Sequence, residues 1–393
     1  MKININKLMI KNLLISCAIY PILGQYYLKI APISLGQILI LLSTILYSFC
    51  YKKIKFNKSI FCTGLLMSLY NFIPALKYNS IINTVNNSLS ILIFFSIISL
   101  SINIIKNNLN EFYSILKVCG LICTIFLFIQ VIMHDFWGIN IYGRISILDN
   151  WFKTTNDNVF IWIDYGRPDS LFYEPAHYCI YMTPILLLSL LYRKYFYAVI
   201  FGIGMILSTS TTGYAMIAIC VSIYLFIKMN KNVKFFLIPI IVLCFIYMAF
   251  YNGVDMGKLE INSLNENIRA FGTLKYFKNF TLIDWISGIG FNRMAEWGSI
   301  YGMVNNNYSN SIFFMIFSFG FFGIGFILYF IIRLIKGKYW RPMILVMFIM
   351  LCSDQMCFNN NFGYLLICVL LCSYSSINEI IGKSIIKGEE NNE

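Results

Sequence analysis

The chain has 393 residues, of which 59% are hydrophobic and only 12% are charged, and its mean hydropathy is +0.72. A soluble globular domain carries about 25% charged residues, so the composition excludes that class. The formal net charge of +13 would favour nucleic-acid binding in a soluble domain. In a membrane protein the placement of the charges sets the topology instead, so we expect no nucleic-acid partner.

Apolar runs long enough to cross a bilayer recur along the whole chain. A helix needs roughly 20 apolar residues to span a hydrocarbon core of about 30 Å. We therefore predict an all-α, polytopic membrane protein with a single transmembrane domain over residues 1–393. It has about twelve predicted spans, near residues 9–28, 33–51, 59–76, 88–105, 113–133, 175–192, 195–209, 212–228, 234–251, 311–332, 341–358 and 362–380.

Lys and Arg residues gather in alternate connections between these spans. If the N-terminus is cytoplasmic, the inside connections hold most of them, whereas the short outside turns hold only Lys29 and Lys77. Because cytoplasmic connections are enriched in Lys and Arg, this pattern predicts an even number of spans with both termini in the cytoplasm. The main inside clusters lie at residues 52–58, 228–234 and 333–341.

Two connections, 134–174 and 252–310, are much longer than the others. Four predicted spans separate them, so we expect both to lie on the external face. Each mixes acidic and basic residues, which is typical of a polar substrate site and not of a basic patch that binds lipid.

The first long connection ends in a stretch rich in functional residue types, residues 166–178. Pro175 suits the first position of a helix, and Glu174 suits its cap, where an acid meets the positive end of the helix dipole. An acidic helix start explains Glu174 as well as a catalytic role does. It explains Arg167 and His177 less well.

Two further segments carry notable patterns. The turn between the predicted seventh and eighth spans reads Leu-Ser-Thr-Ser-Thr-Thr-Gly at residues 207–213, and the second long connection contains Gly-Ile-Gly-Phe-Asn-Arg at residues 288–293. The glycine pair in the latter predicts a tight turn. Apolar residues at a spacing of three to four along residues 264–280 predict an amphipathic helix lying on the membrane.

Taken in order, these motifs resemble the O-antigen polymerase and ligase superfamily, the Wzy-type polymerases and their relatives. The resemblance covers about residues 110–335 and rests on Arg167 followed by Phe172-Tyr173-Glu174-Pro175, on the 207–213 turn, and on Arg269 leading to Gly288-Ile289-Gly290 and Asn310 before a Gly-rich span. It implies a membrane glycosyltransferase architecture of the GT-C type. The chain departs from relatives at Thr211, where they often have Arg, and at Asn305–Asn310, where ligases typically have His. Both His residues of the chain, His134 and His177, belong to the first long connection, which favours polymerase over ligase.

The resemblance implies a polymerase of oligosaccharide repeat units linked to undecaprenyl diphosphate, making O-antigen, capsule or exopolysaccharide. Such an enzyme transfers the nascent glycan to a new lipid-linked unit on the external face of the bacterial inner (plasma) membrane. The implied partners are the lipid-linked oligosaccharide, membrane lipid and a chain-length regulator protein. No cofactor or metal is expected, since no metal-ligand spacing stands out.

The leaving diphosphate needs planar donors that form two hydrogen bonds, and Arg supplies them. The candidates are Arg167, Arg269 and Arg293. Contact with phospholipid headgroups or ion pairs within the loops is the competing reading of these residues.

The acceptor hydroxyl needs orientation or deprotonation, for which Glu174 and His177 are the first candidates, followed by Asp169 and Asp164. Weaker candidates for contact with the glycan are Trp162, Tyr173 and Asn310.

A flippase or exporter of the same lipid-linked oligosaccharide is the main rival from another class, and a ligase of the same superfamily is a second alternative. An exporter would not need two long external loops with Arg motifs. It would be expected to have a polar cavity shared by two similar halves.

Overall fold

The structure, a computed structural model, describes residues 5–29, 33–51, 56–78, 81–154, 167–228, 274–301, 309–335, 346–347, 349–351 and 358–372. Over these residues the fold is predominantly α-helical, with one antiparallel sheet of two short strands, which confirms the predicted all-α class. The chain divides into two compact units. Unit 1 comprises Met1–Lys52, Ile105–Asp255 and Leu370–Glu393, and unit 2 comprises Lys53–Ile104 and Met256–Val369.

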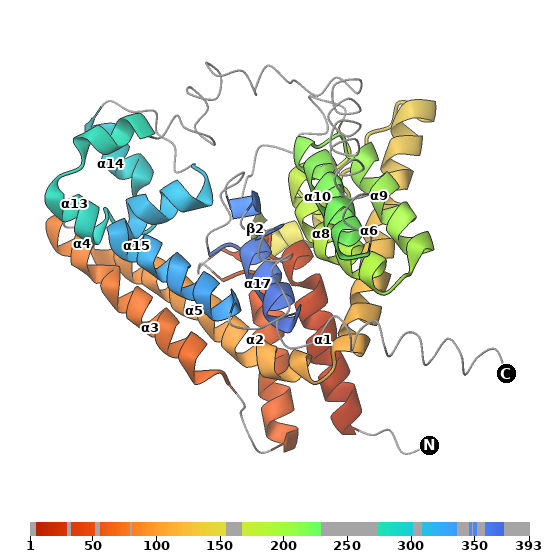
Figure 1. The fold of residues 1–393 in the computed structure, drawn as a ribbon, viewed down its shortest axis with the longest axis horizontal. Helices are drawn as coiled ribbons and strands as arrows, with labels where there is room; N and C mark the ends of the chain where they lie inside the picture. Colours follow the sequence, from red (N-terminus) through yellow and green to blue (C-terminus); the bar gives the residue numbers. More distant parts are fainter. Residues whose placement is uncertain are drawn as a thin grey trace. The chain divides into compact units, whose positions relative to one another are not determined.

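In unit 1, helices α1 and α6 pack together, and α8 packs against α9 and α10 (Figure 1). Helix α6 also contacts α8 and α9, while α2 packs on α1. The described elements of this unit are α1 (Ile5–Leu23), β1 (Tyr26–Leu28), α2 (Leu35–Tyr51), α6 (Leu109–Trp137), the 3₁₀ helix η1 (Ser146–Asn150), β2 (Phe152–Thr154), α8 (Pro175–Leu191), α9 (Tyr195–Leu207) and α10 (Thr211–Lys228).

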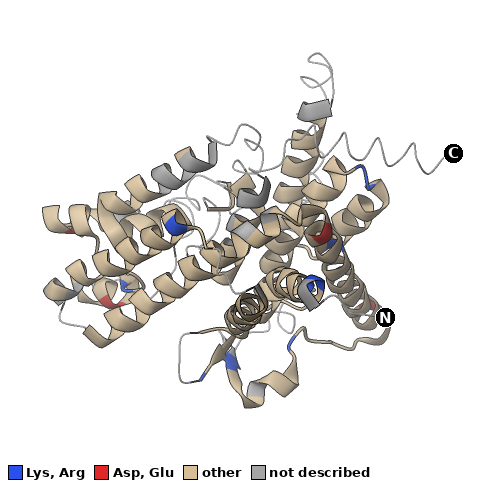
Figure 2. Ribbon diagram, turned by 90° about the horizontal axis from the view of Figure 1, so that it is seen from below, with Lys and Arg blue, Asp and Glu red and all other residues tan. Residues whose placement is uncertain are grey.

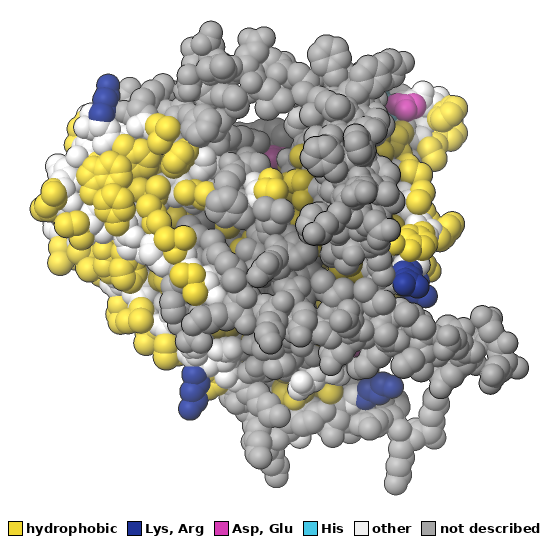
Figure 3. Space-filling model, in the orientation of Figure 1, with side chains coloured by type: hydrophobic (Ala, Val, Ile, Leu, Met, Phe, Trp, Pro, Cys, Tyr) yellow, Lys and Arg dark blue, Asp and Glu magenta, His cyan; other side chains and the backbone are white. Residues whose placement is uncertain are grey.

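Unit 2 is built around α15, on which the short helix α13 packs. Its described elements are α3 (Lys58–Tyr70), α4 (Phe72–Tyr78), most of α5 (Ile81–Lys106), the 3₁₀ helix η3 (Leu274–Asn279), α13 (Leu282–Ser287), α14 (Met294–Ile300), α15 (Ser311–Ile335) and most of α17 (Asn360–Cys372). An aromatic core joins η3, α14 and α15, and its buried members are Phe277, Phe280, Ile289, Met294, Trp297, Ile316 and Phe317. Hydrophobic side chains also cover much of the described surface of this unit (Figure 3).

Helix α6 is apolar on both sides. One side is buried in unit 1, and the other exposes a stripe of β-branched residues at a spacing of three to four: Val118, Ile122, Ile125, Ile129 and Ile132. A helix that is hydrophobic all round is a core helix of a large protein or a membrane span, and exposed apolar stripes mark contact with an apolar environment.

Two described helices are long and apolar enough to cross a bilayer, over Ile81–Ile102 and Leu109–Trp137, with mean hydropathies of 1.8 and 2.5. At a rise of about 1.5 Å per residue, each reaches across a hydrocarbon core of about 30 Å. Charged residues are sparse along the described helices (Figure 2). The count of about twelve spans remains a prediction.

Two predicted spans are helical but interrupted. The run at 59–76 is divided at Asn71, whose buried amide accepts the N–H of Phe291 at 2.8 Å. Helix α15 kinks at Gly320, where φ is 59° and ψ is −149°. A Cβ at this glycine would overlap the carbonyl oxygens of Trp285 and Ile286, so α13 approaches α15 only because the residue is glycine.

Several predicted segments differ from the structure or lie outside the part it describes. Residues 274–279 form a 3₁₀ helix in place of the predicted α-helix, and residues 264–273 of that segment are outside the described residues. The predicted span at 234–251 is also outside them, and the span at 341–358 is described only in part.

The strands β1 and β2 pair antiparallel, with Tyr26 opposite Thr154, and the Lys29 ammonium donates to the carbonyl oxygen of Asn150 at 3.0 Å. The sequence does not predict this sheet, because strands of three residues are too short to show an alternation of apolar and polar residues. The pairing ties the turn after α1 to the first long connection.

Candidate functional site

Arg167 contacts the turn between α9 and α10. Its Nη2 donates to the carbonyl oxygen of Thr209 at 3.1 Å, and its Nε donates to the Thr209 hydroxyl at 3.3 Å. Thr209 lies two residues before Thr211, the first residue of α10. The structure therefore joins two motifs, Arg167 and the 207–213 turn, that are far apart in the sequence.

The turn has an unusual backbone that its surroundings hold in place. Thr209 has φ of 50°, a left-handed conformation that is uncommon for a β-branched residue. Its N–H donates to the carbonyl oxygen of Ile206 at 3.0 Å, and the neighbouring Ser208 hydroxyl donates to Met205 at 2.7 Å and contacts the Cys179 thiol at 3.1 Å. Residues held in such conformations cluster at functional sites, where the surrounding structure over-determines them.

Glu174 and Pro175 begin α8 as the sequence predicted, with Glu174 at the N-cap and Pro175 in the first turn. The Glu174 side chain makes no capping hydrogen bond. Its half-buried carboxylate therefore lies at the positive end of α8 without being used by the helix backbone, which weakens the reading of Glu174 as only a cap.

His177 is buried, with 6% of its surface exposed, and its Nε2 lies 3.2 Å from the hydroxyl of Tyr173. The two rings meet edge to face, with centroids 4.3 Å apart. The His177 side chain thus contacts Tyr173, one turn earlier, while Glu174 contributes its carbonyl oxygen to the His177 N–H. A Tyr–His pair of this kind fixes the orientation of the imidazole ring.

Asp169 ranks behind Glu174 and His177 as a candidate base. It is buried, with 1% of its surface exposed. Its Oδ1 accepts a hydrogen bond from Nε2 of Gln130 in α6 at 2.9 Å. Burial raises the pKa of the Asp169 carboxyl to about 7, and the hydrogen bond from Gln130 opposes part of that rise.

Arg293, the second candidate for the diphosphate within the described residues, belongs to unit 2. Its guanidinium is buried, with 4% of the residue exposed, and donates to the hydroxyl of Thr84 in α5. A Cβ at Gly290 would lie 3.1 Å from Cδ of Arg293, so the glycine leaves room for this side chain. Burial and the bond to Thr84 favour a role for Arg293 in holding the 288–293 turn.

That turn is tight, as the glycine pair predicted, with φ of 73° at Gly288 and 96° at Gly290. The N–H groups of Ile289 and Gly290 donate to the carbonyl oxygens of Phe317 and Ser318 at 2.8 and 3.1 Å. The kink in α15 accounts for this pairing, because carbonyls next to a break in a helix lack their usual partners.

Asn310 is buried at the start of α15, and its Oδ1 accepts the N–H of Phe313 at 2.9 Å. It is therefore an N-cap. Trp162 and Arg269 lie outside the described residues. No group of three His, Cys, Asp or Glu side chains suited to a metal ion occurs in the part of the chain that the structure describes.

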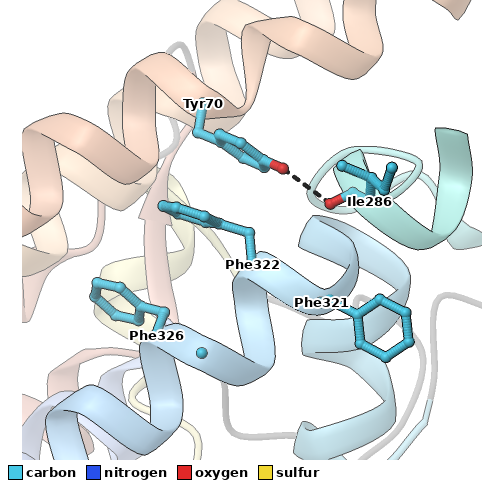
Figure 4. A pocket seen from close by; sticks show the side chains of 6 residues that line it. Tyr70, Ile286, Phe321, Phe322 and Phe326 are labelled. Carbon is cyan, nitrogen blue, oxygen red and sulfur yellow. Dashed lines mark hydrogen bonds between the residues drawn. The ribbon is translucent and has the colours of Figure 1, made fainter.

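Unit 2 also contains a groove of about 600 Å³ between α3, α13 and α15 (Figure 4), lined by Tyr70, Ile286, Phe321, Phe322, Gly325 and Phe326. The Tyr70 ring stacks on Phe322 at 4.2 Å, and its hydroxyl donates to the carbonyl oxygen of Ile286 at 2.9 Å. Its lining is apolar apart from this hydroxyl, so the groove offers no group that would bind a diphosphate.

Comparisons of the chain with protein-family models, with curated proteins and with solved structures found no match.

Proposed function

We propose that the protein polymerises oligosaccharide repeat units linked to undecaprenyl diphosphate, on the external face of a bacterial plasma membrane. The observation that carries the proposal is the double hydrogen bond from Arg167 to Thr209. It brings together two motifs whose order in the sequence resembles that of the polymerase and ligase superfamily.

In this reaction the bond between the anomeric carbon of the growing glycan and the diphosphate oxygen breaks. A new bond forms from that carbon to a sugar hydroxyl of the next lipid-linked unit, and undecaprenyl diphosphate leaves. Arg167 is suited to the developing negative charge, because a guanidinium binds phosphate through two parallel hydrogen bonds. The start of α10, an 18-residue helix next to Thr209, adds the positive end of its dipole.

The proton of the acceptor hydroxyl needs a destination. Glu174 offers a carboxylate that the α8 backbone does not use, and His177 offers an imidazole oriented by Tyr173. In the proposal Glu174 is the base and the Tyr173–His177 pair helps to orient the acceptor sugar. Arg269 remains a second proposed contact for the diphosphate.

Two helices long enough to cross a bilayer and the apolar stripe on α6 support the membrane location. The proposal further includes cytoplasmic termini, the long connections 134–174 and 252–310 on the external face, and a chain-length regulator protein as a partner.

The test is elongation of a synthetic undecaprenyl-diphosphate-linked oligosaccharide by the purified full chain in liposomes, with product length read on a gel. We expect a ladder with the wild type. Arg167→Lys keeps the charge but loses the planar donors, so we expect roughly a 10- to 150-fold slower reaction, corresponding to about 1.5–3 kcal/mol. The control is Arg193→Lys, in the exposed turn after α8, which should elongate normally.

Full activity of Arg167→Lys at normal protein level would contradict the assignment of Arg167. Lipid-linked units that cross the bilayer without being elongated would identify an exporter, and transfer of glycan to a lipid acceptor of another kind would identify a ligase.

A further inference from the structure

The segment that carries Arg167, Tyr173 and Glu174 runs through the interior of unit 1, and two glutamines hold it. Gln25, in the turn after α1, donates from Nε2 to the carbonyl oxygen of Leu171 at 2.9 Å. Gln130, in α6, is fully buried, with 0% exposed, and forms hydrogen bonds to Asp169 and Ser170 of the segment.

Gln130 uses both ends of its amide. Its Oε1 accepts the N–H of Ser170 at 2.8 Å, and its Nε2 donates to Asp169 Oδ1 at 2.9 Å. The same Nε2 lies 3.0 Å from the carbonyl oxygen of Ile141 and 3.3 Å from that of Ser170. The Ser170 N–H can only donate, so it fixes which end of the amide faces it.

The backbone at Ser170 needs such support. Its φ is 58°, in the left-handed region that costs an L-residue free energy, and its hydroxyl donates to the carbonyl oxygen of Cys123 at 2.7 Å. The chain at Gly143 also approaches so closely that a Cβ there would overlap the Ser170 carbonyl. The surrounding hydrogen bonds therefore select a conformation that the local sequence does not favour.

Only Pro168 separates Arg167 from Asp169 and Ser170, the two residues that Gln130 holds. Proline fixes its own φ near −65° and restricts the preceding residue to extended conformations, so the Arg167–Pro168 step is stiff. A shift at Asp169 or Ser170 would accordingly move the backbone of Arg167 and with it the guanidinium.

We propose that Gln130 is a positioning residue that places Arg167 by clamping Asp169 and Ser170 through its buried side-chain amide. This inference rests on the proposed function, since Arg167 is the group that contacts the diphosphate. Gln130 itself does not touch the substrate.

The test compares Gln130→Met with Gln37→Met in the full chain. Methionine keeps the length of glutamine but makes none of its hydrogen bonds. Gln37 is a matched control because it is also buried in unit 1 and also accepts a Ser N–H through Oε1, from Ser34 at 2.9 Å, but at the start of α2. Elongation and amide hydrogen exchange of residues 167–174 are both measured.

We expect Gln130→Met to slow elongation roughly 10- to 100-fold, as a displacement of about 1 Å at a reacting site does, and to speed exchange of the Ser170 amide. Gln37→Met should change neither. Because Gln130 acts through Arg167, adding Gln130→Met to Arg167→Lys should slow the reaction little further. If the double variant's rate falls by the product of the two single-variant factors, Gln130 has a general structural role and the proposal is overturned.

A second variant covers the case in which Gln130→Met does not accumulate. Gln130→Glu keeps an acceptor for the Ser170 N–H but loses the donor to Asp169. Combined with Asp169→Asn, the hydrogen bond is restored in the opposite direction, because the new amide at position 169 donates to the new carboxylate at position 130. We expect the double variant to be more active than Gln130→Glu alone. Equal activity of the two, or wild-type activity of Gln130→Glu, would reject the clamp. A wild-type chain that elongates nothing overturns the proposed function instead, while faster Ser170 exchange in the variant would still establish the clamp.

Discussion

Asp169 is a carboxyl group that folding removes almost completely from water. One oxygen accepts a hydrogen bond from Gln130, and the other, Oδ2, has no hydrogen-bond partner among the described residues. Arg167, the nearest cation along the chain, donates hydrogen bonds to Thr209. A buried carboxyl in these surroundings is more stable in its neutral form.

The pH dependence of stability follows from this. Burial raises the pKa of the Asp169 carboxyl from 3.8 to about 7, so between these pH values the folded state binds more protons than the unfolded state. Stability therefore falls as the pH rises through that window, by up to about 1.4 kcal/mol per pH unit, and this contribution is constant above about pH 7. Asp169→Asn should match the wild type near pH 4 and be more stable near pH 8, as measured by thermal unfolding in detergent. Parallel pH profiles for the two proteins would contradict the raised pKa.

A substitution at Glu174 distinguishes its two possible roles, general base and helix cap. Its side chain makes no capping hydrogen bond, so Glu174→Gln should change the unfolding temperature little, whereas loss of a general base slows a reaction by roughly 10²- to 10⁴-fold. We expect Glu174→Gln to accumulate single lipid-linked units in membranes that contain normal amounts of the protein. Wild-type polymer from this variant would direct attention to His177, through His177→Asn.

At the scale of elements, the approach of α10 to its neighbours depends on a single glycine. A Cβ at Gly213 would lie 2.7 Å from the Cys179 thiol and 2.8 Å from the carbonyl oxygen of Met205, closer than van der Waals contact allows. We expect Gly213→Ala to push α10 away from α8 and α9, to lower stability by about 1–3 kcal/mol and to reduce elongation by displacing Thr209. Thermal unfolding and the elongation assay measure the two effects.

Gly202, in the middle of α9, is the matched control, because nothing lies within 4 Å of a Cβ built there. Alanine is a better helix former than glycine, so Gly202→Ala should raise stability by about 0.5–1 kcal/mol. Equal destabilisation by both substitutions would mean that the loss does not come from the contact of α10 with α8 and α9.

Hydropathy predicts most of the helices of unit 1 but not the interruptions within helices. Long apolar runs predicted α1, α2, α5, α6, α8, α9 and α10. A continuous apolar helix is stabilised either by burial against other helices or by contact with lipid. The division at Asn71 and the kink at Gly320 could not be read from hydropathy. Both depend on partners more than 30 residues away or on a clash between helices.

For the whole molecule, the charge pattern predicts that residues 134–174 and 252–310 face the same side of the membrane. In a background cleared of native cysteines, Asn150→Cys and Lys275→Cys should both react with an impermeant thiol reagent added from outside. Intact cells or sealed vesicles give the measurement, and a cysteine in the cytoplasmic cluster at 52–58 is the control that should remain unlabelled. Labelling of position 150 without position 275 would overturn this topology.

The sequence by itself determined that the chain is helical and apolar, and where α8 begins. These properties follow from composition, from the length of apolar runs and from Pro175, all of which act over a few residues of chain. Only the tertiary structure decided that Arg167 binds Thr209 and that Gln130 clamps the segment between α6 and α8. The Arg167 and Gln130 contacts join residues about 40 positions apart. The left-handed backbone at Ser170 and Thr209 exists because the surrounding hydrogen bonds offset its local cost, which no property of those residues alone predicts.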